Sequence, residues 1–206
     1  MIRALVLDFG NVISEPHDTG CYARMADISG LSTEFFMKAF WKFRPEFDRG
    51  DINGMQMYRD VLADAGVSLP EPELNSLARK LLNEDLGSWF HISREVTEWA
   101  LGLQAGGLRL GILSNMPHDF MDRFGDRIEL FTKADVAVFS CFVNQIKPEP
   151  PIYQTLIERI GCAPEEIVFF DDLEANVAAA RRAGINAFVW KGLEQGKRDF
   201  AEIARE

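Results

Sequence analysis

The second half of the chain alternates short apolar runs with helical stripes, and this alternation constrains the fold more than any other feature. Apolar side chains recur at helical spacing over residues 96–103, and the strand-like run LRLGIL follows them. With the run near the N-terminus, the predicted strands cover residues 4–7, 108–113, 136–142, 166–172 and 185–190. Alternation of this kind implies right-handed crossovers, so it predicts an α/β protein with a Rossmann-like, mainly parallel sheet and helices on both faces.

The segment between residues 16 and 90 breaks this alternation. It contains apolar stripes at helical spacing, formed by Phe36, Phe40 and Phe43, by Tyr58, Val61, Leu62 and Ala65, and by Leu74, Leu77 and Leu81. We therefore predict an all-helical insertion over residues 16–90, with residues 1–15 and 91–206 forming the α/β core. Phe35 and Trp41 extend the first stripe around the helix, which fits either burial between helices or a subunit contact. The expected oligomeric state is therefore a monomer or a homodimer.

Composition excludes several classes of function. The formal net charge of −10 over 206 residues argues against a general nucleic-acid surface, which needs clustered Lys and Arg. Three cysteines without paired spacing favour buried free thiols over a disulfide or zinc site, which fits a reducing cytoplasm. An aspartate interrupts the first apolar run too early for a signal peptide, and we expect no membrane-spanning segment.

Polar side chains follow four of the predicted strands at the point where each strand ends. They are Asp8, Ser114 with Asn115, Lys147 after a short loop, and Asp171 with Asp172. Ligands of an open parallel sheet bind beyond the carboxyl ends of its strands, so we expect these groups to converge. Three carboxylates repel one another unless a cation lies among them, and oxygen ligands suit Mg²⁺. A lysine and a serine then suit a phosphate, and an aspartate is a competent nucleophile toward phosphorus.

These segments resemble, in order, the motifs of the haloacid dehalogenase-like hydrolase superfamily. The matching residues are LDFGNV at 7–12, LSN at 113–115, KPEP at 147–150 and FFDD at 169–172. The helical insertion over 16–90 looks like the small cap of that superfamily. GDING, KPEPPIY and FFDDLEAN look especially like its sugar-phosphate phosphatases and its epoxide-hydrolase N-terminal phosphatase domains. The resemblance therefore implies a Mg²⁺-dependent phosphatase that hydrolyses a small phosphorylated metabolite, with a sugar phosphate as the expected class.

The resemblance also implies a role for each matching residue. Asp8 would be the nucleophile, Ser114 would bind phosphate through its hydroxyl, and Lys147 would balance the charge of the phosphate. Asn115 would help to position the same phosphate.

The implied metal ligands are Asp8, the backbone carbonyl of Gly10 and Asp172. Asp171 would hold the metal or its waters.

Gly10 is where the chain departs from the superfamily, because most of its phosphatases carry a second aspartate there as general acid. Loss of a general acid costs roughly 10²- to 10⁴-fold, most for an alkoxide leaving group and least for an aryl one. The connection into the insertion contains Glu15, His17 and Asp18, and we hypothesise that one of them replaces the acid.

Two other functions remain open on the same fold. A haloacid dehalogenase would use the same aspartate on carbon without metal, although the double aspartate argues against it. A non-catalytic protein that binds a metabolite or another protein would explain the loss of the acid, although Asp8, Lys147 and Asp172 are retained.

Overall fold

The structure is a computed structural model that describes residues 1–205. Its centre is a five-stranded, fully parallel sheet in the order β3-β2-β1-β4-β5, which confirms the predicted fold class. The strands are β1 (Ala4–Leu7), β2 (Arg109–Ser114), β3 (Val136–Phe139), β4 (Ile167–Asp171) and β5 (Asn186–Val189). Because β1 lies in the middle of the sheet, the residue that follows it is placed at the centre of the carboxyl edge.

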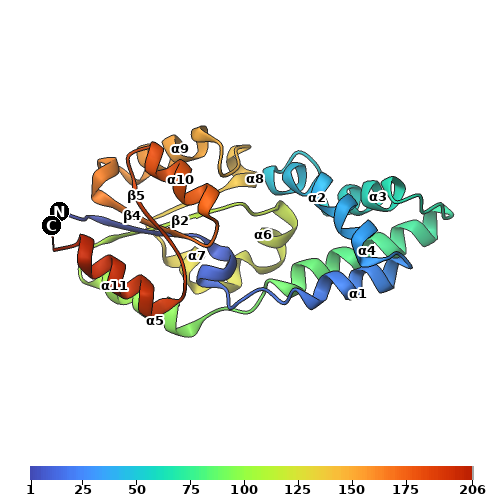
Figure 1. Ribbon diagram of the computed structural model, residues 1–206, viewed down its shortest axis with the longest axis horizontal. Helices are drawn as coiled ribbons and strands as arrows, with labels where there is room; N and C mark the ends of the chain where they lie inside the picture. Colours follow the sequence, from blue (N-terminus) through green and yellow to red (C-terminus); the bar gives the residue numbers. More distant parts are fainter. Residues whose placement is uncertain (206) are drawn as a thin grey trace.

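Helices cover both faces of the sheet (Figure 1). They are α5 (Arg94–Ala105), α6 (His118–Phe124), α7 (Glu129–Lys133), α8 (Ser140–Val143), α9 (Pro150–Ile160), α10 (Glu174–Arg182) and α11 (Leu193–Ile203). Side chains of β1 alternate between the faces: Leu5 and Leu7 belong to one apolar cluster, whereas Val6 packs with α9 and α10 in the other. Among residues 1–205, no helix combines the length and the apolar character that crossing a membrane requires.

Four helices lie together at one end of the molecule, to the right in Figure 1. They are α1 (Gly20–Ser29), α2 (Thr33–Arg49), α3 (Gly54–Asp64) and α4 (Glu71–Ser88), and all four lie within residues 16–90. The side chains of Ser32 and Asn53 cap α2 and α3 by accepting backbone N–H bonds. Phe36 and Phe40 are fully buried between these helices, whereas Phe35 and Trp41 are 65% and 52% exposed.

The chain enters and leaves this helical segment at neighbouring points. Ser14 and Ile92 form an isolated antiparallel bridge. The N–H of Glu15 donates to the carbonyl of His91, and the N–H of Ser93 donates to the carbonyl of Ile13. The two connecting segments are therefore hydrogen bonded to each other beside the sheet.

The predicted strand over residues 136–142 is wrong in its last part, because β3 ends at Phe139 and Ser140 begins the short helix α8. The buried hydroxyl of Ser140 accepts a hydrogen bond from the N–H of Met116 at 2.7 Å and donates to the carbonyl of Asp48. Turning the chain at this serine brings α8 against the end of α2. The apolar residues that follow continue the strand-like pattern in the sequence but pack in a helix.

Candidate active site

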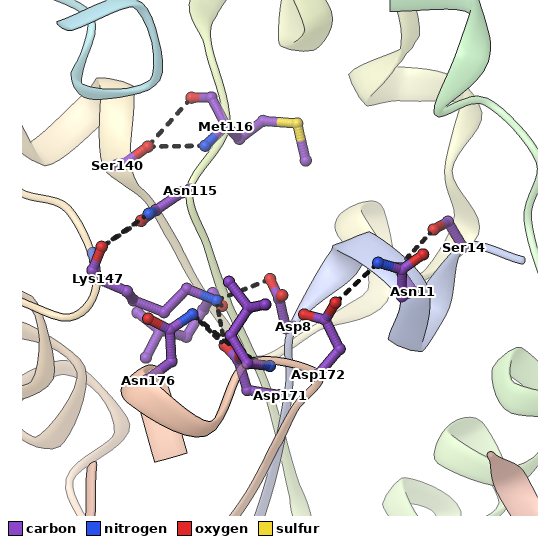
Figure 2. Close-up of polar contacts among 12 residues, drawn as sticks. Asp8, Asn11, Ser14, Asn115, Met116, Ser140, Lys147, Asp171, Asp172 and Asn176 are labelled. Atoms are coloured by element: carbon purple, nitrogen blue, oxygen red, sulfur yellow. Dashed lines mark hydrogen bonds and ion pairs between the residues drawn. The ribbon is translucent and has the colours of Figure 1, made fainter. Parts of the chain in front are cut away.

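Asp8, at the carboxyl end of β1, faces the ammonium group of Lys147. Lys147 Nζ lies 2.8 Å from Asp8 Oδ1 and 2.6 Å from Asp171 Oδ2, so it bridges two carboxylates (Figure 2). All three side chains are buried. Lys147 Nζ also donates to the carbonyl of Leu113 at 3.0 Å, which fixes the amine relative to the end of β2.

The carboxylate of Asp171 is fully used by protein donors. Its Oδ1 accepts from the N–H of Leu173 and from the amide of Asn176, both at 2.9 Å. Its Oδ2 accepts from Lys147 and, at 3.1 Å, from the same Asn176 amide. Asp171 is therefore arranged to hold Lys147, and its oxygens point to these partners.

Asn115 holds the backbone of Lys147. Its amide donates to the Lys147 carbonyl at 2.9 Å, and its side-chain oxygen accepts from the Lys147 N–H at 2.8 Å. Ser114, directly before it at the end of β2, is buried and lies close enough to Asp8 to hydrogen bond its carboxylate. The sequence therefore brings Ser114, Asn115 and Lys147 together with Asp8, as expected for groups on one sheet edge.

Asp8, Asp171 and Asp172 each present a carboxylate oxygen within 4.8 Å of the other two. Asp172 Oδ2 accepts from the side-chain amide of Asn11 at 2.7 Å, which leaves its other oxygen facing the cluster. Because all the candidate donors are carboxylate or carbonyl oxygens, the set suits a hard cation such as Mg²⁺. Asp8, Asp171 and Asp172 are the side chains that could hold such an ion, and Gly10 follows in the turn after β1.

Burial makes the charged form of Asp8 costly. The net pKa of Asp8 is raised from 3.8 to about 7, mainly because desolvation outweighs the lowering effect of Lys147; Asp171 raises it further, and hydrogen bonds from Lys147 and Ser114 lower it. Burial also lowers the pKa of Lys147, but Asp171 and Asp8 more than offset this, so the net pKa lies above its ordinary value. The carboxyl of Asp172 has a raised pKa, mainly through burial. An excess of carboxylates over local cations is what an added divalent ion would relieve.

Trp89 occupies the space where a side chain at Gly10 would lie. A Cβ atom built on Gly10 would come 3.2 Å from the Trp89 ring. The imidazole of His17 stacks on the same indole, with ring centroids 3.7 Å apart and planes 14° apart. Asn11, with φ +56°, turns the chain here and accepts from the N–H of His17 at 2.8 Å. The space beside Gly10 is therefore occupied by the Trp89 ring, on which His17 stacks.

Of the three residues hypothesised to replace the acid, His17 lines the cavity above Asp8. Asp18 pairs with Arg24 at 2.7 Å instead, and Glu15 is exposed. His17 Nε2 lies 2.9 Å from the hydroxyl of Ser88, which donates to a backbone carbonyl. Nε2 therefore carries the proton and donates, and Nδ1 keeps a lone pair in the neutral ring. Burial lowers the pKa of His17, which favours this neutral form.

The cavity has a volume of about 600 Å³ and lies between the sheet edge and the helical segment. Asp8, Ser114, Lys147 and Asp172 line it from the sheet edge. Aromatic side chains line it from the helical segment, among them Tyr22, Trp41 and Trp89. The cavity can therefore hold a small molecule with one end at the carboxylates.

Two positioning residues, Asn11 and Asn176, were missed by the sequence analysis. Both lie inside the segments LDFGNV and FFDDLEAN, and Asn176 is a polar residue on the otherwise apolar buried side of α10. A buried polar residue in such a stripe is a usable signal, because it must find a partner inside the protein.

Comparison with known proteins agrees with this arrangement of a strand-end aspartate, a serine, a lysine and a double aspartate. Residues 2–184 match the family of haloacid dehalogenase-like hydrolases. The chain belongs to this family. Curated relatives include phosphatases: a phosphorylated carbohydrates phosphatase from Thermotoga maritima is 40% identical over 73 residues, which cover 34% of each chain.

Bifunctional epoxide hydrolase 2 from Mus musculus is 27% identical over 200 residues, which cover 89% of this chain and 35% of that protein. The chain thus spans about a third of the length of this relative.

Solved structures share the fold over almost the whole chain. A HAD-like family hydrolase from Porphyromonas gingivalis superposes with a TM-score of 0.76 at 24% identity, covering 100% of this chain and 99% of the other. A HAD family enzyme from Bacteroides thetaiotaomicron, in complex with magnesium and inorganic phosphate, has a TM-score of 0.72 at 19% identity, covering 93% of this chain and 95% of the other. These similarities establish the fold.

Proposed function

We propose that the protein is a Mg²⁺-dependent phosphomonoesterase that forms an aspartyl phosphate on Asp8. The observation that carries the proposal is the position of Asp8 at the centre of the sheet edge, 2.8 Å from Lys147 Nζ and within reach of two further carboxylates. A nucleophile, a fixed cation and an oxygen-only metal set are the groups that phosphoryl transfer needs.

In the first step, Asp8 attacks phosphorus, so a bond from its carboxylate oxygen to phosphorus forms as the bond to the leaving oxygen breaks. The Ser114 hydroxyl donates to a non-bridging oxygen, and Lys147 stabilises the negative charge. Asp171 and Asn115 act through Lys147, because they hold its amine and its backbone. Asp8, Asp172 and the Gly10 carbonyl would hold Mg²⁺, which supplies charge neutralisation to the transferring group.

In the second step, water attacks phosphorus and releases inorganic phosphate, and the carboxylate of Asp8 is regenerated. Neutral His17, which lines the cavity, would accept a proton from this water. Its lowered pKa makes it a poor acid for the leaving group at neutral pH. The leaving oxygen therefore takes its proton from solvent.

Residues 16–90 would act as a cap over the core formed by residues 1–15 and 91–206. Side chains from this segment line the cavity opposite the sheet edge, and closure over a substrate would exclude water from the first step. The T. maritima relative and the phosphate complex of the B. thetaiotaomicron enzyme support a small phosphorylated substrate. A sugar phosphate is the class that the resemblance implies, and it stays a prediction.

Phosphate release from 4-nitrophenyl phosphate and from sugar phosphates, with Mg²⁺ and with a chelator, tests the proposal. We expect release that requires both the metal and Asp8, so that Asp8→Asn is inactive. Halide release from 2-chloropropionate without metal would establish the dehalogenase alternative instead. Binding of Mg²⁺ and orthovanadate without turnover of any ester would favour the non-catalytic alternative.

A further inference from the structure

The wall of the cavity that faces the sheet edge is a continuous row of aromatic rings. Trp89 stacks on His17, the His17 and Tyr22 ring centroids lie 5.4 Å apart, and those of Tyr22 and Trp41 lie 6.2 Å apart. These four side chains come from the connection before α1, from α1, from α2 and from the residue after α4. All of them line the cavity that contains Asp8. The part of a substrate that extends away from phosphorus would therefore lie along this wall.

The cationic groups that line the same cavity are paired with carboxylates. Arg44 Nε lies 2.8 Å from Asp48, and its Nη1 lies 3.2 Å from the buried carboxylate of Asp85. Lys147 is held by Asp8 and Asp171. Among the described residues that line the cavity, no Lys or Arg other than Arg44 and Lys147 is present. An anionic leaving group would therefore find no uncommitted cation there.

The polar amides of the lining are also committed to the protein. Asn11 uses its amide on Asp172 and its oxygen on the N–H of His17. Asn115 uses both of its polar atoms on the backbone of Lys147. Beyond the hydroxyls of Thr19 and Tyr22 and the unpartnered indole N–H of Trp89, the lining offers few free groups to bind the hydroxyls of a sugar. Each buried hydroxyl without a partner lowers affinity by about tenfold or more.

A flat apolar group fits the same wall without this loss, because it exchanges water for stacking contacts with aromatic faces. The ring that fills the Gly10 position adds a second argument, since no carboxylate can protonate a leaving oxygen there. Aryl oxygens leave without such help far more readily than alkoxides do.

We infer that the substrate is a phosphomonoester with an uncharged aromatic leaving group that stacks on the wall formed by His17, Tyr22, Trp41 and Trp89. This inference rests on the proposed phosphatase function and names its substrate class. That class differs from the sugar phosphates that the resemblance implies.

The test compares two esters of primary alcohols, 2-phenylethyl phosphate and glucose 6-phosphate, so that leaving-group acidity is similar and recognition dominates. We expect kcat/KM for 2-phenylethyl phosphate to be at least about tenfold higher. Trp41→Ala should reduce this preference about tenfold. Phe35→Ala is the matched control, because Phe35 is an exposed aromatic on the same helix and lies outside the cavity lining, and it should keep the full preference.

A binding measurement separates recognition from turnover. In calorimetric titrations with Mg²⁺ present, 3-phenylpropylphosphonate should bind at least about tenfold tighter than methylphosphonate to the wild type, and the difference should shrink in Trp41→Ala. Equal binding of the two phosphonates, or a higher kcat/KM for glucose 6-phosphate, would overturn the inference while leaving the phosphatase proposal intact. If neither ester releases phosphate and 4-nitrophenyl phosphate also releases none, the phosphatase proposal fails, and the titrations alone decide whether the cavity recognises an aromatic group.

Discussion

Replacing Asp8 by asparagine should stabilise the metal-free protein while abolishing turnover. Burial raises the pKa of Asp8 to about 7, whereas an aspartate in an unfolded chain titrates near 3.9. Because the folded pKa is the higher one, the charged form of Asp8 destabilises the fold. This penalty is absent below about pH 4, grows as the pH rises, and reaches its full size above about pH 7.

The size of the effect follows from these two pKa values. Each factor of ten in the proton equilibrium corresponds to about 1.4 kcal/mol, so the penalty is about 4 kcal/mol at pH 8 and about 2 kcal/mol at pH 5.5. The oxygen of an asparagine can still accept from Lys147, so Asp8→Asn removes the charge and keeps the contact. For a chain of this length, about 1 kcal/mol moves Tm by roughly 2–4 °C. We expect Tm to rise by about 10 °C at pH 8 and about 5 °C at pH 5.5.

The assay is thermal unfolding followed by circular dichroism in EDTA at both pH values, for the wild type and two isosteric variants. Asp171→Asn is the matched control from the same cluster, and it should lower Tm. The Asp171 carboxylate accepts from three protein donors, and breaking such a buried pair costs about 3 kcal/mol. A lower Tm for Asp8→Asn at pH 8, or the same gain at both pH values, would refute the reasoning.

Three further predictions concern turnover. Asn11→Gly keeps the positive φ but removes the amide that holds Asp172. The Mg²⁺ concentration for half-maximal phosphate release should therefore rise about tenfold. An unchanged metal titration would contradict this role. Ser114→Ala should lower kcat/KM for 4-nitrophenyl phosphate about 10- to 100-fold with Tm nearly unchanged, because one hydrogen bond to a charged group is lost. His17→Gln should lower kcat about 10²-fold and alter the pH–rate profile. Glu15→Gln and Asp18→Asn should leave both unchanged. Identical profiles for all three variants would end the hypothesis that one of these residues moves a proton.

Apolar runs and helical stripes were sufficient to predict the succession of strands and helices along the chain, because a buried parallel strand requires a short continuous apolar segment. The pattern failed at Ser140, where the apolar sequence continues but a buried hydroxyl bonds to two other segments and turns the chain. Asp8, Lys147 and Asp171 could be expected together in advance, because Asp8 follows β1, Asp171 ends β4 and Lys147 lies in the connection that follows β3.

The aromatic wall could not be placed in the same way. Tyr22 and Trp41 lie on different helices, and their proximity depends on how α1 and α2 pack. The sequence showed only that aromatic rings cover more than one side of α2. Which of these rings is buried, as Phe36 is, and which faces the cavity is decided by contacts with the other helices.

The bridge between Ser14 and Ile92 places both ends of the helical segment side by side, at the margin of the sheet. A segment whose ends meet can be lengthened, exchanged or rebuilt without changing the distance that the rest of the chain must span. The groups proposed to bind and attack phosphorus lie outside that segment, whereas all four rings of the wall lie within residues 16–90, including His17 with its proposed proton transfer. Selection can therefore revise which leaving group this scaffold accepts while Asp8, Ser114, Lys147 and Asp172 stay in place, and a grafted helical segment that keeps His17 should transfer substrate preference between relatives.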